Sequence, residues 1–345
     1  MLHGGEIYDK KIKYDFSVNL NPCPCPGSLK QAVIYAVDKM EYYPDIEGTA
    51  FREAIASAER VKPSNVTGTN GASELLTSLV RFIDPGKILL PEPSFFGYIH
   101  AINMLKGVVL ESLPLREEND FRLDESLLQK ITEDTDLLIL ANPNNPTGKC
   151  IDDDLLEKIV YKCGDTGTAL IVDECFIKLS TAGSSIKKYL GKVPRIFIVD
   201  SYTKLFSVPG VRVGYCMSGE EETVGLKKYL PEWNVSIFAE KAGIAGAEII
   251  KNTDFLSESL KEIRNRREEL YKGLEGCGIR YYESDSVFIL IKSPKDLYNA
   301  LLERGILIRD CSNFNTLSKG FYRIAVKDHE SNMALIRELS RMTEA

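Results

Sequence analysis

The chain has 345 residues, 44% hydrophobic and 27% charged, so it is long enough to bury a core and to form one large domain plus a smaller one. Its 43 basic and 50 acidic residues give a net charge of −7, which argues against nucleic acid or an anionic membrane as partner and favours a small molecule. With no apolar run of membrane-spanning length and no signal-peptide pattern, we expect a cytoplasmic protein.

The eight cysteines are scattered, and the only close pair, Cys23 and Cys25, is held extended by flanking prolines. A zinc site needs further cysteine or histidine ligands at suitable spacing, and the chain has three histidines. We therefore expect no metal site and interpret the cysteines as reduced structural thiols.

The first predicted element is a helix with Ser28 as its N-cap, which stops before Tyr43-Pro44. From about residue 50 to 235, short apolar runs alternate with helical stretches in a βαβ rhythm. Runs that are apolar at every position are typical of strands covered on both faces by helices, so we predict a central, mostly parallel sheet. The expected strands are Lys87–Leu90, Val108–Leu113, Asp136–Leu140, Ala169–Val172 and Arg195–Val199.

The pattern then changes to a long amphipathic helix over Thr253–Gly276, followed by a compact α+β unit. Its expected strands and helices are Ser286–Ile291, Ile306–Arg309, Tyr322–Val326, 295–304 and 329–343. We predict an α/β protein with a large domain over residues 43–235 and a small domain formed by 236–345 with 1–42 as an N-terminal arm. No long linker separates the two, so they should share a cleft.

Three of the predicted strands are followed at once by polar residues, and in open α/β sheets ligands bind at the carboxyl ends of strands. Asn142–Gly148 (NPNNPTG) follows one strand, Asp173 the next, and Lys204 in Ser-Tyr-Thr-Lys the third, with Arg212 shortly after. Alone, each has an ordinary alternative: a polar turn, a solvated acidic loop, a surface lysine. Together they supply what pyridoxal phosphate needs, namely an amine, a carboxylate, an amide, hydroxyls and a cation.

Upstream, the string Thr67–Glu74 leads into the apolar helix Leu75–Phe82. Small residues and free backbone N–H groups at a helix N-terminus make a seat for an anion. A simply capped helix has a similar sequence, so both interpretations stay open.

In the order of these strings the chain resembles the fold-type I pyridoxal-phosphate enzymes of the class I and II aminotransferase group over nearly its whole length. The resemblance implies the aspartate aminotransferase-like fold, with a seven-stranded sheet in the large domain. It further implies that Lys204 forms the imine with the cofactor, that Asp173 pairs with the pyridine nitrogen, and that Asn145 bonds the phenolic oxygen. Phe95 would stack on the ring. The implied phosphate ligands are Gly71, Ala72, Ser73, Ser201, Thr203, Arg212 and, from the neighbouring subunit of a homodimer with shared sites, Tyr43.

One position departs from the family pattern. Many aminotransferases of this group have tyrosine three residues after the aspartate, where this chain has Phe176, so the phenolic oxygen has one donor fewer. Core packing is the alternative for both Phe95 and Phe176, because apolar aromatics beside a sheet usually fill space.

Two arginines in apolar strands bear on the substrate, Arg309 and Arg323. An arginine among buried residues needs a partner, which is either a substrate carboxylate or phosphate or an internal acid. In the family, the arginine at the position of Arg323 binds the substrate carboxylate.

The opening His3-Gly4-Gly5, the string around Asn19 and the string Ile-Leu-Ile-Arg-Asp-Cys around Arg309 resemble one branch, the L-threonine-O-3-phosphate decarboxylases of cobalamin side-chain synthesis. Histidinol-phosphate aminotransferases typically lack the His-Gly-Gly opening. The branch implies that His3, Asn19 and Arg309 hold a substrate phosphate or carboxylate.

We favour decarboxylation of a phosphorylated amino acid. Transamination of histidinol phosphate or another amino acid stays open, because the sequence does not fix which bond at the α-carbon is aligned for cleavage, and one scaffold hosts both chemistries. A non-catalytic binding or regulatory protein is a third hypothesis. The presence of Lys204, Asp173, Asn145 and Arg212 together argues against it.

Overall fold

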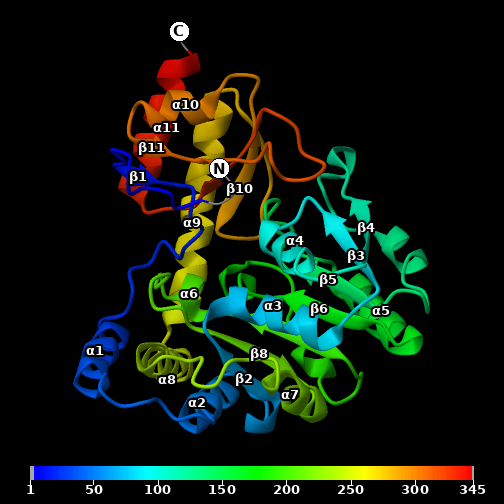
Figure 1. Cartoon of the computed structure of the whole chain (residues 1–345). Helices are drawn as coiled ribbons and strands as arrows, with labels where there is room; N and C mark the ends of the chain where they lie inside the picture. The colour runs from blue at the N-terminus through cyan, green and yellow to red at the C-terminus, as the bar shows by residue number, and fades with distance from the viewer. Residues whose placement is uncertain (1–3, 344–345) are drawn as a thin grey trace.

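The computed structural model describes residues 4–343 (Figure 1). Its centre is a seven-stranded sheet in the order β2-β8-β7-β6-β5-β3-β4. The strands are β2 (Val66–Thr69), β3 (Lys87–Glu92), β4 (Val109–Pro114), β5 (Leu137–Ala141), β6 (Ala169–Asp173), β7 (Ile196–Asp200) and β8 (Gly214–Ser218). Only β8 runs antiparallel to its neighbours among these strands, so the predicted mostly parallel sheet is confirmed.

The five strands expected from apolar runs are all present, with ends shifted by one or two residues. β5, β6 and β7 are buried at almost every position, as strands covered on both faces must be. The prediction missed β2 and β8, which contain glycine and polar residues. Gly214 in β8 has a tertiary reason, because a Cβ there would lie 2.7 Å from the backbone of Gly71.

Eight α-helices accompany this sheet within the described part of the chain: α1 (Gly27–Ala36), α2 (Thr49–Glu59), α3 (Gly71–Ile83), α4 (Phe96–Ile102), α5 (Asp153–Thr166), α6 (Tyr202–Leu205), α7 (Glu220–Lys227) and α8 (Ile237–Asn252). The prediction of Ser28 as N-cap was wrong, since α1 begins at Gly27 and Pro26 occupies the cap without a side-chain bond. Short 3-10 turns are η1 (Val37–Lys39), η2 (Pro63–Asn65), η3 (Glu117–Asn119), η4 (Glu125–Gln129), η5 (Ile177–Leu179) and η6 (Ile186–Tyr189).

A second, antiparallel sheet has the order β12-β13-β10-β9. Its strands are β9 (Arg280–Tyr282), β10 (Phe288–Lys292), β12 (Arg309–Asp310) and β13 (Phe321–Ala325). Its helices are α9 (Phe255–Gly276), α10 (Leu297–Leu302) and α11 (His329–Thr343). The N-terminal arm joins this unit because β1 (Tyr14–Asp15) pairs in parallel with β11 (Ile306–Leu307).

Helix α9 runs between the two units, and α8 packs against α1 and α2 beside the large sheet (Figure 1). The division of the chain at residue 235 stays a prediction. None of the helices within residues 4–343 is long and apolar enough to cross a membrane. The same residues contain no cluster of three or more histidine, cysteine, aspartate or glutamate side chains placed to hold a metal ion.

Candidate active site

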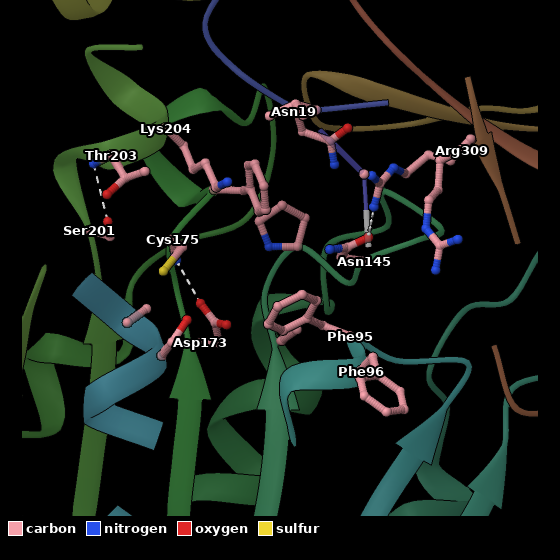
Figure 2. A pocket seen from close by; sticks show the side chains of 18 of the residues that line it. Asn19, Phe95, Phe96, Asn145, Asp173, Cys175, Ser201, Thr203, Lys204 and Arg309 are labelled. Carbon is pink, nitrogen blue, oxygen red and sulfur yellow. Dashed lines mark hydrogen bonds between the residues drawn. The ribbon is translucent and has the colours of Figure 1, made fainter. Parts of the chain in front are cut away.

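A pocket of about 240 Å³ lies where β5, β6 and β7 end, facing the small sheet (Figure 2). Figure 2 shows Lys204, Asn19 and Arg309 directed toward the same space from separate parts of the chain. The pocket brings together twelve residues that the sequence singled out, namely Asn19, Ala72, Ser73, Phe95, Asn145, Asp173, Ser201, Thr203, Lys204, Arg212, Arg309 and Arg323.

Lys204 lies on the four-residue helix α6, directly after β7. The hydroxyl of Ser201 caps this helix by accepting the backbone N–H of Thr203 at 3.1 Å. Burial lowers the pKa of Lys204, and the positive charges of Arg323 and Arg212 act in the same direction. The neutral amine, which is the nucleophilic form, is therefore more populated here than on a surface lysine.

Asp173 ends β6, and two donors hold its carboxylate. The hydroxyl of Tyr98 donates to Oδ2 at 2.7 Å, and the backbone N–H of Cys175 donates to Oδ1 at 3.0 Å. Burial, followed by the charge of Asp173, raises the pKa of Tyr98 well above its usual range, so the tyrosine remains a protonated donor. Both bonds fix the orientation of the carboxylate at the end of β6.

The sequence analysis missed Tyr98, although its position close to Phe95 in the chain could have pointed to it. Tyr98 is three residues after Phe95, which is the N-cap of α4, so the two side chains are close in sequence. The two rings meet edge to face with centroids 5.6 Å apart. Phe95 therefore lines the pocket while it rests on the tyrosine that holds Asp173.

The N-terminus of α3, for which the sequence left open an anion seat or a simply capped helix, borders the pocket. Gly71 has φ +76°, a backbone conformation that favours glycine, and Nη2 of Arg212 lies only 2.5 Å from where a Cβ would be. Gly71 itself does not line the pocket, whereas Arg212, Ala72 and Ser73 do. Across from them, the hydroxyls of Ser201 and Thr203 donate to the carbonyl of Val213 at 2.8 Å and 3.3 Å.

Arg323 of β13 reaches across to the strand ends of the large sheet. Its Nη1 donates to Oδ1 of Asn145 at 2.5 Å and its Nη2 to the carbonyl of Ser17 at 2.8 Å. Both acceptors are neutral, and Nε has no hydrogen-bond partner among the described residues. Burial lowers the pKa of Arg323 to about 10, and the charge of Arg309 adds to this effect. These contacts do not form the internal salt bridge that was the alternative for this arginine.

The outcome differs for three further residues that the sequence singled out, Tyr43, His3 and Phe176. Tyr43 is 81% exposed, its ring lies 5.0 Å from that of Trp233, and it does not line the pocket of its own chain. His3 lies outside the described residues. Phe176 lines the pocket and also packs edge to face on Phe288 at 5.1 Å, so it has both surroundings that the sequence left open.

Comparison with known proteins identifies the family. The profile of the family described as aminotransferase class I and II matches residues 11–339. A Caldanaerobacter subterraneus subsp. tengcongensis protein with a provisional threonine-phosphate decarboxylase name is 34% identical over 99% of this chain and 94% of its own length. The threonine-phosphate decarboxylase of Salmonella typhimurium is 28% identical over 98% of this chain and 95% of its own.

A solved structure agrees over the whole architecture. The crystal structure of histidinol-phosphate aminotransferase from Clostridium acetobutylicum has a TM-score of 0.88 and 29% identity, and the match covers 96% of this chain and 99% of that one. The fold is thus the aspartate aminotransferase-like fold that the sequence predicted. The chain belongs to the aminotransferase class I and II family and is a pyridoxal-phosphate-dependent enzyme.

Proposed function

We propose that this enzyme decarboxylates a small phosphorylated amino acid of the L-threonine O-3-phosphate type and works as a homodimer. The observation that carries the proposal is that two arginines, Arg309 and Arg323, line one pocket together with Lys204. A substrate with a phosphate at one end and a carboxylate at the other offers one anion to each arginine. The names of the two decarboxylase relatives support the same substrate class.

The pocket residues fit pyridoxal phosphate. The close approach of Arg212 to the N-terminus of α3 suits a phosphate, and the doubly hydrogen-bonded Asp173 suits a protonated ring nitrogen. Asn145 would bond the ring hydroxyl, Phe95 would stack on the ring, and Lys204 would attach the cofactor. Residues assigned to the phosphate are Gly71, Ala72, Ser73, Ser201, Thr203 and Arg212.

When bound, pyridoxal phosphate acts as an electron sink that makes one bond at the substrate α-carbon labile. The protein decides which bond by holding the substrate. We assign the carboxylate to Arg323 and the phosphate to Arg309 and Asn19, with His3 as a further ligand. Anchors at both ends of a short substrate leave little freedom to rotate about the α-carbon. The amine of Lys204, with its lowered pKa, is suited to accept or return a proton there.

The homodimer is supported by an exposed apolar surface next to Tyr43. Its large side chains include Ile34, Tyr35, Met40, Tyr42, Tyr43 and Trp233, which are 42–81% exposed. Surfaces of this kind on a monomer mark protein interfaces. With this surface covered by a second copy, Tyr43 would reach the phosphate seat of the partner, as the family resemblance implies.

The test uses the purified protein loaded with pyridoxal phosphate and given L-threonine O-3-phosphate. Stoichiometric release of carbon dioxide without a keto acid is expected. Formation of a keto acid, with the cofactor converted to its pyridoxamine form, would contradict decarboxylation. The enzyme would then be an aminotransferase, the activity named for the Clostridium structure, and histidinol phosphate is the amino donor to try next.

A further inference from the structure

The guanidinium of Arg309 is oriented by the loop that connects β12 to β13, here called the 311–320 loop. Nη1 of Arg309 donates to the carbonyl of Asp310 at 2.6 Å, and Nη2 donates to Oδ1 of Asn313 at 2.8 Å. The guanidinium also lies over the ring of Phe314, 5.1 Å from its centroid. Arg309 is 3% exposed and lines the pocket, and these contacts help to orient it there.

The oxygens of Asp310 and Asn313 that accept these bonds are neutral. Asn313 thus holds the guanidinium without placing a negative charge beside it. An aspartate at position 313 would have nearly the same shape and would also accept the bond. Its negative charge would, however, pair with Arg309 and compete with any anionic ligand.

The same loop is fastened to the large sheet. Nδ2 of Asn315 donates to Oε1 of Glu92 at 2.8 Å, and the hydroxyl of Ser112 donates to Oε2 of the same carboxylate at 2.5 Å. Glu92 ends β3 and is buried. Phe314, which lies in the chain between Asn313 and Asn315, forms part of the pocket wall. The 311–320 loop thus connects Arg309, on the small sheet, with an edge of the large one.

We propose that Asn313 is a positioning residue that presents Arg309 to the distal phosphate of the substrate, and that its neutrality makes the enzyme select phosphorylated over unphosphorylated amino acids. This deepens the proposed function and rests on it where Arg309 receives the substrate phosphate. Arg323 holds the carboxylate end, so a change at Asn313 affects recognition of one end of the substrate only.

The experiment compares the loaded wild-type enzyme with Asn313→Asp and Asn313→Ala. In the loaded enzyme the cofactor's own phosphate fills its seat, so inorganic phosphate is a probe of the distal site. We expect Asn313→Asp to weaken phosphate binding and raise KM for L-threonine O-3-phosphate, each about tenfold, with kcat within about twofold. Asn313→Ala should cause a smaller loss, because it removes the orientation of Arg309 but leaves its charge.

The matched control is Asn119→Asp, which adds the same charge at an exposed asparagine outside the pocket and should change neither value. L-threonine serves as the unphosphorylated comparison, and its turnover should be unaffected by all three changes. Unchanged phosphate affinity in both Asn313 variants would overturn the proposal. An equal loss for L-threonine and its phosphate would also overturn it, since that is the behaviour of a merely structural residue.

The proposed function can fail separately. If the wild-type enzyme releases no carbon dioxide but binds phosphate in a manner that depends on Asn313, the decarboxylase assignment is wrong and the role of Asn313 stands. If the wild-type enzyme neither binds phosphate nor prefers a phosphorylated substrate, the role of Asn313 is wrong, whatever the reaction.

Discussion

The hydroxyl of Tyr98 lies 2.7 Å from Oδ2 of Asp173, and the ring of Tyr98 packs edge to face against that of Phe95. One side chain thus connects the carboxylate proposed for the ring nitrogen with the aromatic proposed for the ring face. Tyr98→Phe keeps the ring and removes the donor. A hydrogen bond to a charged group contributes about 1.5–3 kcal/mol, so we expect clearly weaker cofactor binding with the fold preserved.

The measurement is titration of the cofactor-free protein with pyridoxal phosphate, followed by the visible absorption of the bound cofactor. Tyr189→Phe, at a tyrosine outside the pocket, serves as the control and should bind normally. Equal affinities of the Tyr98 variant and wild type would show that Asp173 does not depend on this bond.

Lys204→Ala should abolish turnover, because the amine that attaches the cofactor and moves the proton is lost. The cofactor should still bind through its phosphate but without the visible band of a lysine-attached cofactor. Absorption spectroscopy and an activity assay check this. Lys158→Ala, at an exposed lysine paired with Glu125, is the control. Near-normal activity of the Lys204 variant would remove the basis of the assignment.

Arg323→Ala should mainly raise KM, since the substrate carboxylate loses its charged partner. Removal of such a contact is expected to lower kcat/KM by roughly 30- to 150-fold, equivalent to about 2–3 kcal/mol. Arg323→Lys should recover part of this loss because it restores the charge without the fork geometry. Steady-state kinetics on both variants decide the matter, and an unchanged kcat/KM in Arg323→Ala would exclude substrate binding by this arginine.

Behind the active site, the buried ammonium of Lys178 contacts the carboxylates of Glu59 and Asp200. Asp200 also accepts the backbone N–H of Ser201, the residue that caps the helix of Lys204. Lys178→Met leaves these two buried carboxylates without their shared cation, which should lower the free energy of unfolding by about 3–5 kcal/mol. Urea denaturation measures this loss.

The control for this change is Lys158→Met, which breaks an exposed ion pair and should cost less than about 1 kcal/mol. A similar small loss for both variants would mean that the buried cluster contributes little.

Glu174 predicts a specific dependence of stability on pH. Burial raises its pKa from the ordinary 4.5 to about 7. Between these two values the folded chain binds the proton more tightly than the unfolded chain, so this group lowers stability as pH rises through the window and adds no change above it. Glu174→Gln should remove that contribution, giving a variant that is more stable than wild type at pH 8 by up to roughly 3 kcal/mol and similar to it at pH 4. Denaturation midpoints across this range test it, and parallel curves for the two proteins would contradict the assignment.

The sequence by itself determined five of the seven strands of the central sheet and the residues at their ends that line the pocket. A strand covered on both faces must be apolar at every position, so β5, β6 and β7 are visible as uninterrupted apolar runs. Because parallel strands end at one edge, the polar residues that follow those runs had to meet there, which placed Asn145, Asp173 and Lys204 together. The local sequence pattern was sufficient for this prediction, since an apolar run and the polar residues that follow it are neighbours in the chain.

The tertiary structure alone decided how these groups are held. The bonds of Arg309 to Asn313 and of Asn315 to Glu92 depend on how a loop of the small sheet packs against the large one. Gly214 in β8, which made that strand hard to predict from the sequence, is required because the backbone of Gly71 lies against it. Contacts of this kind join residues far apart in sequence, and no periodicity encodes them. Burial fixes where the elements form, whereas the pairing of polar groups is settled only when those elements pack.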